Sequence, residues 1–229
     1  MKIYRPTVSN YLFQKFGENS VCADLDQYGQ TIRPFVVTNA AKGVCPLGKT
    51  PFYKALGMRG HNGEDWAIWR GEAIFFSTFI DGMKWRCVTE VDSSGGIGVN
   101  VISLGIVPEL GTYAKFKFWH LLKVNVSDGQ EIDFGHLIGF GDSTGASSGD
   151  HLHWSMKQCE KDGTSINKNN GYYGAVDFAD WFDNVFVGDI IRVKAQAISL
   201  GAIAQVLILE AKQAIIAAKQ AINEYKGRK

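Results

Sequence analysis

Short runs of alternating apolar and polar residues, separated by glycine and aspartate, recur through the first 188 residues of the chain. The runs from Trp85 to Val91 and from Tyr113 to His120 both have a period of two, which places successive side chains on opposite faces of a strand. The 26 glycines and only 5 prolines suit many tight turns between such strands. This pattern predicts a mainly β domain.

Size and charge limit the classes of function. With 229 residues, 45% hydrophobic and 12% aromatic, the chain is long enough to bury the core of one domain and to carry an appendage. The formal net charge is +1, so the chain has no general basic field of the kind that attracts nucleic acid. We therefore expect no nucleic-acid partner.

Four of the five histidines occur in short motifs, at His61, His120, His151 and His153. His151 and His153 would share one face of a strand, and His61 lies four residues before Asp65. Imidazole nitrogens and carboxylate oxygens are common zinc ligands, and a catalytic zinc ion usually has three of them from the protein. The set is large enough to hold such an ion and to leave two imidazoles for proton transfer near neutral pH.

These motifs also carry a resemblance. The segments His61–Asp65, Trp119–Leu121 and His151–His153 resemble, in this order, the three motifs of the lysostaphin-type (LytM-type) zinc endopeptidases, which cut peptidoglycan cross-bridges. The resemblance extends to Gln14–Asn19, which is similar to the opening of these domains, and to Asp177–Phe186, which is similar to their closing segment. Between the last two motifs it covers Val126, Gly129-Gln130, Ile132, Gly135, Ile138-Gly139, Gly141 and Thr144-Gly145.

The resemblance implies a fold, a cofactor and a set of site residues. Residues 1–188 would form a peptidase domain with an antiparallel β-sheet groove, and residues 20–50 would be an insertion of strand and loop near that groove. One zinc ion would be held by His61, Asp65 and His153, while His120 and His151 would be catalytic residues outside the metal shell. His136 has no counterpart among the functional positions, and we expect it on the surface.

Two positions depart from the family pattern. Phe118 stands where relatives commonly have tyrosine, and Glu64 stands where an aliphatic residue is common. We expect the Glu64 carboxylate to face solvent, with a place behind the metal ligands as the alternative. Among the aromatic residues that follow, Trp66 and Phe75 are expected in the core, although a hydrolase groove also uses such residues as walls.

The composition changes after residue 189. From Ile190 to Tyr225 there is no proline and one internal glycine, Gly201, which predicts a helix about 50 Å long. The sequence of Ala211–Ile215 recurs seven residues later, a heptad spacing typical of coiled coils. We predict that residues 189–229 form a helical tail whose residues 190–225 self-associate or dock on a virion protein. Contact with a membrane surface ranks second, and a membrane span ranks last because Ala195–Leu209 contains polar residues.

The predicted function is hydrolysis of peptide cross-links in bacterial peptidoglycan by a zinc-dependent endopeptidase. Residues 1–6 do not resemble a signal peptide, so we expect synthesis in the cytoplasm and action at the cell wall after lysis or as part of a phage particle. The enzyme would then be a phage endolysin or a virion-associated wall hydrolase. The alternative is a catalytically silent structural module that keeps the peptidase fold and interacts through its helical tail.

The four cysteines show no C-x-x-C spacing, and reduced thiols are the expected state. A bridge between Cys22 and Cys45 is the alternative.

Overall fold

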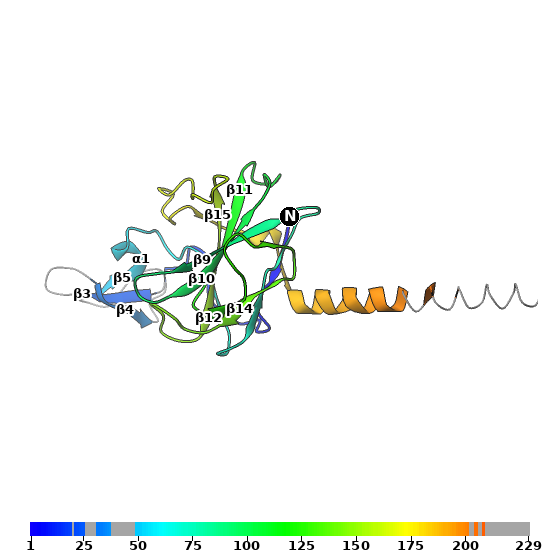
Figure 1. Cartoon of the computed structure of the whole chain (residues 1–229). Helices are drawn as coiled ribbons and strands as arrows, with labels where there is room; N and C mark the ends of the chain where they lie inside the picture. Colours follow the sequence, from blue (N-terminus) through cyan, green and yellow to red (C-terminus); the bar gives the residue numbers. More distant parts are fainter. Residues whose placement is uncertain (20, 26–30, 38–48, 202–203, 206–207, 209–229) are drawn as a thin grey trace, which may run out of the picture. The chain divides into compact units, whose positions relative to one another are not determined.

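The computed structural model of the chain describes residues 1–19, 21–25, 31–37, 49–201, 204–205 and 208 (Figure 1). The chain divides into two units, Met1–Gly188 and Asp189–Lys229, and each is described by itself. Sheets dominate the first unit, and residues 187–201 are helical. The predicted mainly β fold with a C-terminal helix is confirmed.

An eight-stranded sheet forms the centre of the first unit, with neighbouring strands antiparallel throughout. Six of its strands lie in the order β9, β10, β11, β15, β6 and β2, and β13 pairs with the outer side of β9. A further strand, β16, pairs with β15. The bounds are β2 (Leu12–Gln14), β6 (Glu64–Ala67), β9 (Trp85–Val91), β10 (Ile97–Ser103), β11 (Tyr113–Trp119), β13 (Glu131–Ile132), β15 (His151–Cys159) and β16 (Ala175–Val176).

Three smaller sheets accompany it in the part of the chain that the structure describes. One joins β17 (Phe182–Phe186), β1 (Lys2–Arg5) and β8 (Thr78–Phe79), and within it β1 and β17 run parallel, so that the beginning and the end of the unit lie side by side. This end of the chain also has the short helix η2 (Ala179–Trp181). A second sheet joins β12 (Leu121–Val124), β14 (Leu137–Gly141) and β7 (Ala73–Phe75).

The third small sheet lies in the segment predicted as an insertion. It joins β4 (Thr31–Val37), β3 (Val21–Leu25) and β5 (Lys49–Pro51), and the short helix α1 (Phe52–Ala55) packs beside it (Figure 1). Strands are therefore present there, as expected, while residues 26–30 and 38–48 lie outside the described part. The short helix leads directly towards the first histidine motif.

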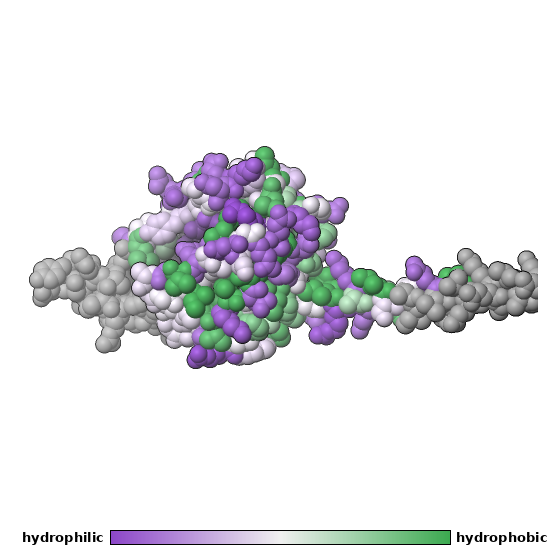
Figure 2. Space-filling view, in the orientation of Figure 1, coloured by the Kyte–Doolittle hydropathy of each residue, from purple (hydrophilic) through white to green (hydrophobic). Residues whose placement is uncertain are grey.

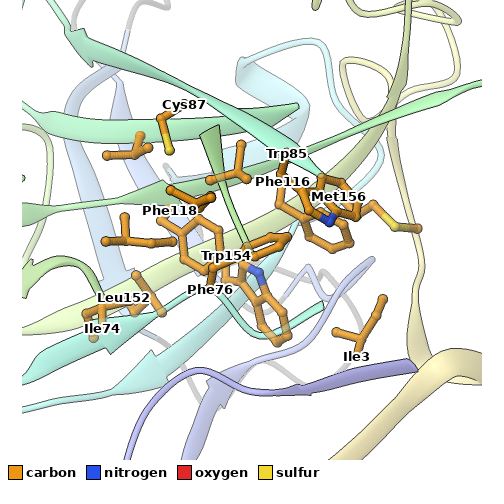
Figure 3. Packing of buried hydrophobic residues seen from close by; sticks show 14 of the residues in the cluster. Ile3, Ile74, Phe76, Trp85, Cys87, Phe116, Phe118, Leu152, Trp154 and Met156 are labelled. Carbon is orange, nitrogen blue, oxygen red and sulfur yellow. The ribbon is translucent and has the colours of Figure 1, made fainter. Parts of the chain in front are cut away.

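One face of the central sheet carries the hydrophobic core. Phe116 and Phe118 of β11 lie opposite Met156 and Trp154 of β15, and all four side chains are fully buried (Figure 3). Phe76 packs against this layer, with its ring 4.9 Å from that of Trp85. Because side chains alternate along a strand, the residues between these core positions face the other side of the sheet.

The structure confirms one of the two core predictions made for the aromatic residues. Trp66 is buried in the core, but Phe75 is only partly buried and packs against Phe186. The core position is taken by Ile74, and Phe76, two residues later, points to the same side, as strand alternation predicts. Cys87 and Cys159 are buried free thiols, whereas the side chains of Cys22 and Cys45 lie outside the described part.

In the second unit, the described helical residues expose apolar as well as charged side chains (Figure 2). Val193, Ile198, Leu200 and Ile208 are all exposed. No helix among the described residues is long and apolar enough to cross a membrane. The predicted heptad positions from Ala211 onward lie outside the described residues.

Candidate metal centre

Two strands of the central sheet bring Asp65 and His153 together. The two residues are direct partners in the antiparallel register of β6 and β15, and His151 lies opposite Ala67 two residues away. Paired residues share one face of a sheet, as do residues two apart on one strand. Asp65, His151 and His153 therefore project from the face opposite the core.

His61 approaches the same face from the loop that precedes β6. Its backbone N–H donates to the Glu18 carbonyl at 2.8 Å, and its carbonyl accepts from the Gly17 N–H at 2.8 Å. Gly63 allows this loop to lie close to β15: a Cβ at that position would lie 2.7 Å from the Trp154 carbonyl oxygen and 2.9 Å from His153 Cε1. A residue with a side chain would therefore push the loop away from its neighbour.

Three ligand atoms converge at this point. Asp65 Oδ1 lies 3.2 Å from His61 Nε2 and 2.9 Å from His153 Nδ1, and the two nitrogens are 3.1 Å apart. Tetrahedral zinc donors, each about 2.1 Å from the ion, are about 3.4 Å from one another. His61 Nδ1 lies 3.3 Å from the Lys15 carbonyl, to which it donates in the tautomer that leaves Nε2 with a free lone pair. The donor set therefore fits a zinc ion in kind, number and spacing.

The electrostatics favour the ligand forms of these groups. Burial opposes ionisation of Asp65, but the interaction with His61 and the hydrogen bonds with His153 and His61 outweigh it and hold the pKa of the carboxyl well below its usual range. Burial lowers the pKa of His153 to about 4, against the opposing influence of Asp65. Near neutral pH the carboxylate is therefore ionised and the His153 imidazole is neutral, as metal binding requires.

His120 reaches the site through an unusual backbone conformation. It stands between β11 and β12 with a φ of 63°, a left-handed value that costs a residue other than glycine about 1–2 kcal/mol. Its Nδ1 donates to the Thr144 carbonyl at 2.7 Å, and its ring lies 4.5 Å from the ring of His151. Burial lowers the pKa of His120, although the bond to Thr144 partly opposes this. The imidazole is thus held neutral with Nε2 as its free nitrogen.

His151 is oriented in a similar way. Its Nδ1 donates to the Gly149 carbonyl at 2.8 Å, which leaves Nε2 as the acceptor nitrogen. That Nε2 lies 3.7 Å from Asp65 Oδ1, beside the three ligand atoms. Two imidazoles with free Nε2 atoms therefore adjoin the donor set without belonging to it.

All five predicted site residues line one pocket of about 560 Å³. His61, Asp65 and His153 form a potential metal-binding group among the described residues, and His120 and His151 lie next to them. The structure thus brings the five residues together, while their individual roles remain predictions. His136 is partly buried and is not part of this pocket. Its Nε2 atom lies 3.1 Å from the side-chain amide nitrogen of Gln130.

The prediction for Glu64 is wrong. Its side chain is only 8% exposed and accepts a hydrogen bond from the Trp66 indole nitrogen at 2.8 Å. The reason is strand alternation. Glu64 and Trp66 project from the core face of β6, whereas Asp65 projects from the opposite face. Burial raises the pKa of this carboxyl, with the indole hydrogen bond opposing the shift.

The sequence pattern missed Tyr53, which also lines the pocket. This residue of α1 is buried, donates from its hydroxyl to Gln14 Oε1 at 2.7 Å, and lies with its ring 5.6 Å from that of His61. No motif spacing marks it as a site residue, because it reaches the pocket through contacts with residues that are distant in the sequence. Phe118, at a position where lysostaphin-type peptidases commonly have tyrosine, lies in the core and not in the pocket.

Comparisons with known proteins were made for the whole chain. No family model matches it, and no curated protein matches it. Among solved structures, it is similar to the catalytic domain of the antimicrobial peptidase lysostaphin from Staphylococcus simulans, with 23% identity over 52% of this chain and 75% of that one, at a TM-score of 0.38.

Two further structures show a similar degree of likeness. A zinc containing peptidase from Vibrio cholerae matches with 20% identity over 58% of this chain and 35% of that one, at a TM-score of 0.37. A point mutant of the catalytic domain of the prophage-encoded M23 protein EnpA from Enterococcus faecalis matches with 18% identity over 48% of this chain and 78% of that one, also at 0.37. The first and third of these neighbours are catalytic domains, of lysostaphin and of an M23 protein, and the second is a zinc containing peptidase.

Proposed function

We propose that this chain is a zinc-dependent endopeptidase that hydrolyses peptide cross-links of bacterial peptidoglycan. The observation that carries the proposal is the convergence of His61 Nε2, Asp65 Oδ1 and His153 Nδ1 in a pocket that also contains two further imidazoles. Peptidoglycan peptides are proposed as the substrate because the three histidine motifs occur in the same order as in the lysostaphin-type peptidases that the sequence resembles.

The metal would be held by the two imidazole nitrogens and the carboxylate oxygen described above. When bound, a zinc ion supplies Lewis acidity that polarises a carbonyl group and makes water more acidic. The protein keeps the ligand nitrogen of His61 available through the bond from Nδ1 to the Lys15 carbonyl, and it keeps His153 neutral through burial. These features prepare the site before an ion arrives.

The free Nε2 atoms of His120 and His151 would move protons. One imidazole would accept a proton from the attacking water at its Nε2 atom and then, as an imidazolium, donate that proton to the leaving amine. Both rings are fixed by a hydrogen bond from Nδ1 to a backbone carbonyl, of Thr144 and of Gly149 respectively. This fixed orientation is what positions a proton carrier for a reaction at the neighbouring metal ligands.

The test measures zinc content and clearing of purified peptidoglycan for the wild type and three variants. We expect His153→Ala to lose zinc and activity, because it removes a ligand, and His120→Ala to keep zinc but lose activity. His136→Ala is the matched control, since this histidine lies outside the pocket, and it should keep both. A wild-type protein that binds no zinc contradicts the proposal, and one that binds zinc but cuts no wall preparation favours the silent structural module.

A narrower form of the proposal concerns where the enzyme acts. We propose that it is a phage endolysin or virion-associated hydrolase, which reaches the wall after lysis or as part of a particle. The helical tail would supply the contact with a second copy or a virion protein, and the exposed apolar residues of its described part support this role. Sedimentation of the full chain tests contact with a second copy, and a search for the chain in purified phage particles tests contact with a virion protein. A monomer that is absent from particles contradicts this role of the tail and the virion-associated form, and leaves only the endolysin form.

A further inference from the structure

The pocket around the metal ligands has two unlike walls. Apolar and aromatic side chains form one wall, contributed by β2, by α1 and by the residues just after α1: Phe13, Phe52, Tyr53, Leu56 and Met58. Short or polar residues form the other wall: Ala146, Ser148, Gly149 and Asp150. A substrate in the pocket can therefore contact apolar side chains from residues 13 and 52–58 and short or polar ones from residues 146–150.

The apolar wall is separate from the main core. Tyr53 and Met58 form a second, small hydrophobic cluster against which Phe52 packs. Two members of the wall remain open to solvent, because Phe13 is 55% exposed and Leu56 is 40% exposed. Large apolar side chains that gather at the mouth of a pocket beside reactive groups are typical of a binding surface.

The wall is firmly attached to the metal site. The Tyr53 hydroxyl donates to Gln14, and Gln14 is the register partner of Asp65 between β2 and β6. The Tyr53 carbonyl accepts from the Met58 N–H at 2.7 Å, and the Leu56 carbonyl accepts a hydrogen bond from the Tyr173 hydroxyl. These bonds fix the wall in place before a substrate binds, which reduces the entropy lost on binding.

We propose that three residues of the apolar wall, Phe13, Phe52 and Leu56, form a subsite for an alkyl side chain of the substrate peptide, close to the bond that is cut. The inference rests on the proposed function and narrows its substrate class. Glycine has no side chain that could contact this wall, whereas one additional methyl group in an apolar pocket changes kcat/KM by about tenfold or more. The enzyme therefore selects cross-links built from alanine or larger residues over glycine bridges.

The first experiment measures binding, so that it does not depend on catalysis. The full chain, labelled with ¹⁵N, is titrated with blocked tetra-alanine peptides of either hand and with blocked tetraglycine, while the amide signals of residues 13 and 56 are followed. We expect at least one alanine peptide to bind about tenfold more tightly than tetraglycine. Equal affinities, or no binding of any of these peptides, would overturn the subsite.

Variants locate the effect on the wall. Phe13→Ala and Leu56→Ala shorten side chains that are already partly exposed, so the fold tolerates them, and each is expected to reduce the preference for alanine to about threefold or less. Ile106→Ala is the matched control, because Ile106 is an apolar residue with 58% exposure outside the pocket. If Phe13→Ala and Leu56→Ala both keep the full preference, the wall is not the subsite.

The second experiment separates this inference from the proposed function. Two preparations of purified peptidoglycan, one with alanine-containing cross-links and one with glycine bridges, are each incubated with the zinc-loaded chain. Faster release of peptides from the peptidoglycan with alanine-containing cross-links supports both proposals. Faster cleavage of the glycine bridges overturns the subsite alone. Selective binding of alanine peptides without cleavage of either peptidoglycan preparation supports the subsite and contradicts the proposed peptidase activity.

Discussion

His153 Nδ1 lies 2.9 Å from Asp65 Oδ1, and the two residues are direct partners across the β6–β15 ladder. The geometry of the donor set is therefore tied to strand register. A shift of one residue would place His153 opposite a different residue and move its side chain to the other face of the sheet. The ladder that builds the sheet also sets the distance between two of the proposed zinc ligands.

Gly63→Ala is expected to weaken zinc binding although it changes no ligand. The new Cβ would lie 2.7 Å from the Trp154 carbonyl and 2.9 Å from His153 Cε1, so the loop that carries His61 must move away from His153. We expect at least a tenfold loss of zinc affinity in competition with a chelator. Gly201→Ala, where an added Cβ meets open space, is the control. Wild-type affinity in Gly63→Ala would contradict this account of the loop.

Thr144→Val is expected to lower the rate of wall cleavage while zinc stays bound. The Thr144 hydroxyl donates to the Leu121 carbonyl at 2.8 Å and accepts from the Ile97 N–H at 3.1 Å, which holds the carbonyl that orients His120. Losing these bonds frees the segment, and we expect kcat to fall about tenfold. Ser148→Ala, on the polar wall of the same pocket, serves for comparison. Loss of zinc in Thr144→Val would assign Thr144 to the metal site instead.

Phe118→Tyr would introduce the residue that lysostaphin-type peptidases commonly have at this position, but we expect no gain in activity. Residue 118 is fully buried against Trp154 and Phe76, on the face of the sheet away from the pocket. A hydroxyl placed in these apolar surroundings costs about 1–3 kcal/mol of stability. Chemical denaturation measures this loss, and Phe79→Tyr at a more exposed position is the control. An increase in kcat would show that the side chain reaches the site.

The stability of the chain should depend on pH through Glu72. Burial raises the pKa of this carboxyl, and backbone hydrogen bonds from Val8 and Trp69 oppose the shift. A raised pKa in the folded state means that the stabilising contribution is present below the unfolded pKa of about 4.5 and is lost as pH rises through the folded pKa. Glu72→Gln should therefore gain stability relative to the wild type between pH 4 and pH 7.

Denaturant titrations of the chelator-treated proteins at both pH values measure this difference. Glu131→Gln, in which an exposed carboxyl is replaced, is the control and should show little change. A constant difference between Glu72→Gln and the wild type at the two pH values would mean that Glu72 titrates as in the unfolded chain.

Local patterns in the sequence predicted the parts of the site that depend on local geometry. The spacing of two residues on a predicted strand, which the structure shows as β15, is sufficient to place His151 and His153 on one face. The same alternation predicts that Glu64 points away from the site, towards the core, because neighbours on a strand point to opposite faces. The solvent-facing prediction failed because a carboxylate is expected outside, whereas here the Trp66 indole provides a buried partner.

Contacts between distant segments could not be predicted in this way. Tyr53 reaches the pocket through a bond to Gln14, 39 residues earlier, and the apolar wall joins β2 to α1 across the segment predicted as an insertion. His120 would point to the core face if its strand continued regularly, and only its left-handed φ turns it to the pocket. Such features depend on tertiary packing, which short spacing patterns do not encode.

The parallel pairing of β1 with β17 also determines how far the first unit can be shortened. Ile3 is aligned with Phe182 and Tyr4 with Asp183, so the first strand of the unit is hydrogen-bonded to its last strand. Removal of either strand would leave an unpaired edge on the other, because edge strands expose unpaired N–H and C=O groups. A truncation at one end of the unit would therefore disturb both ends.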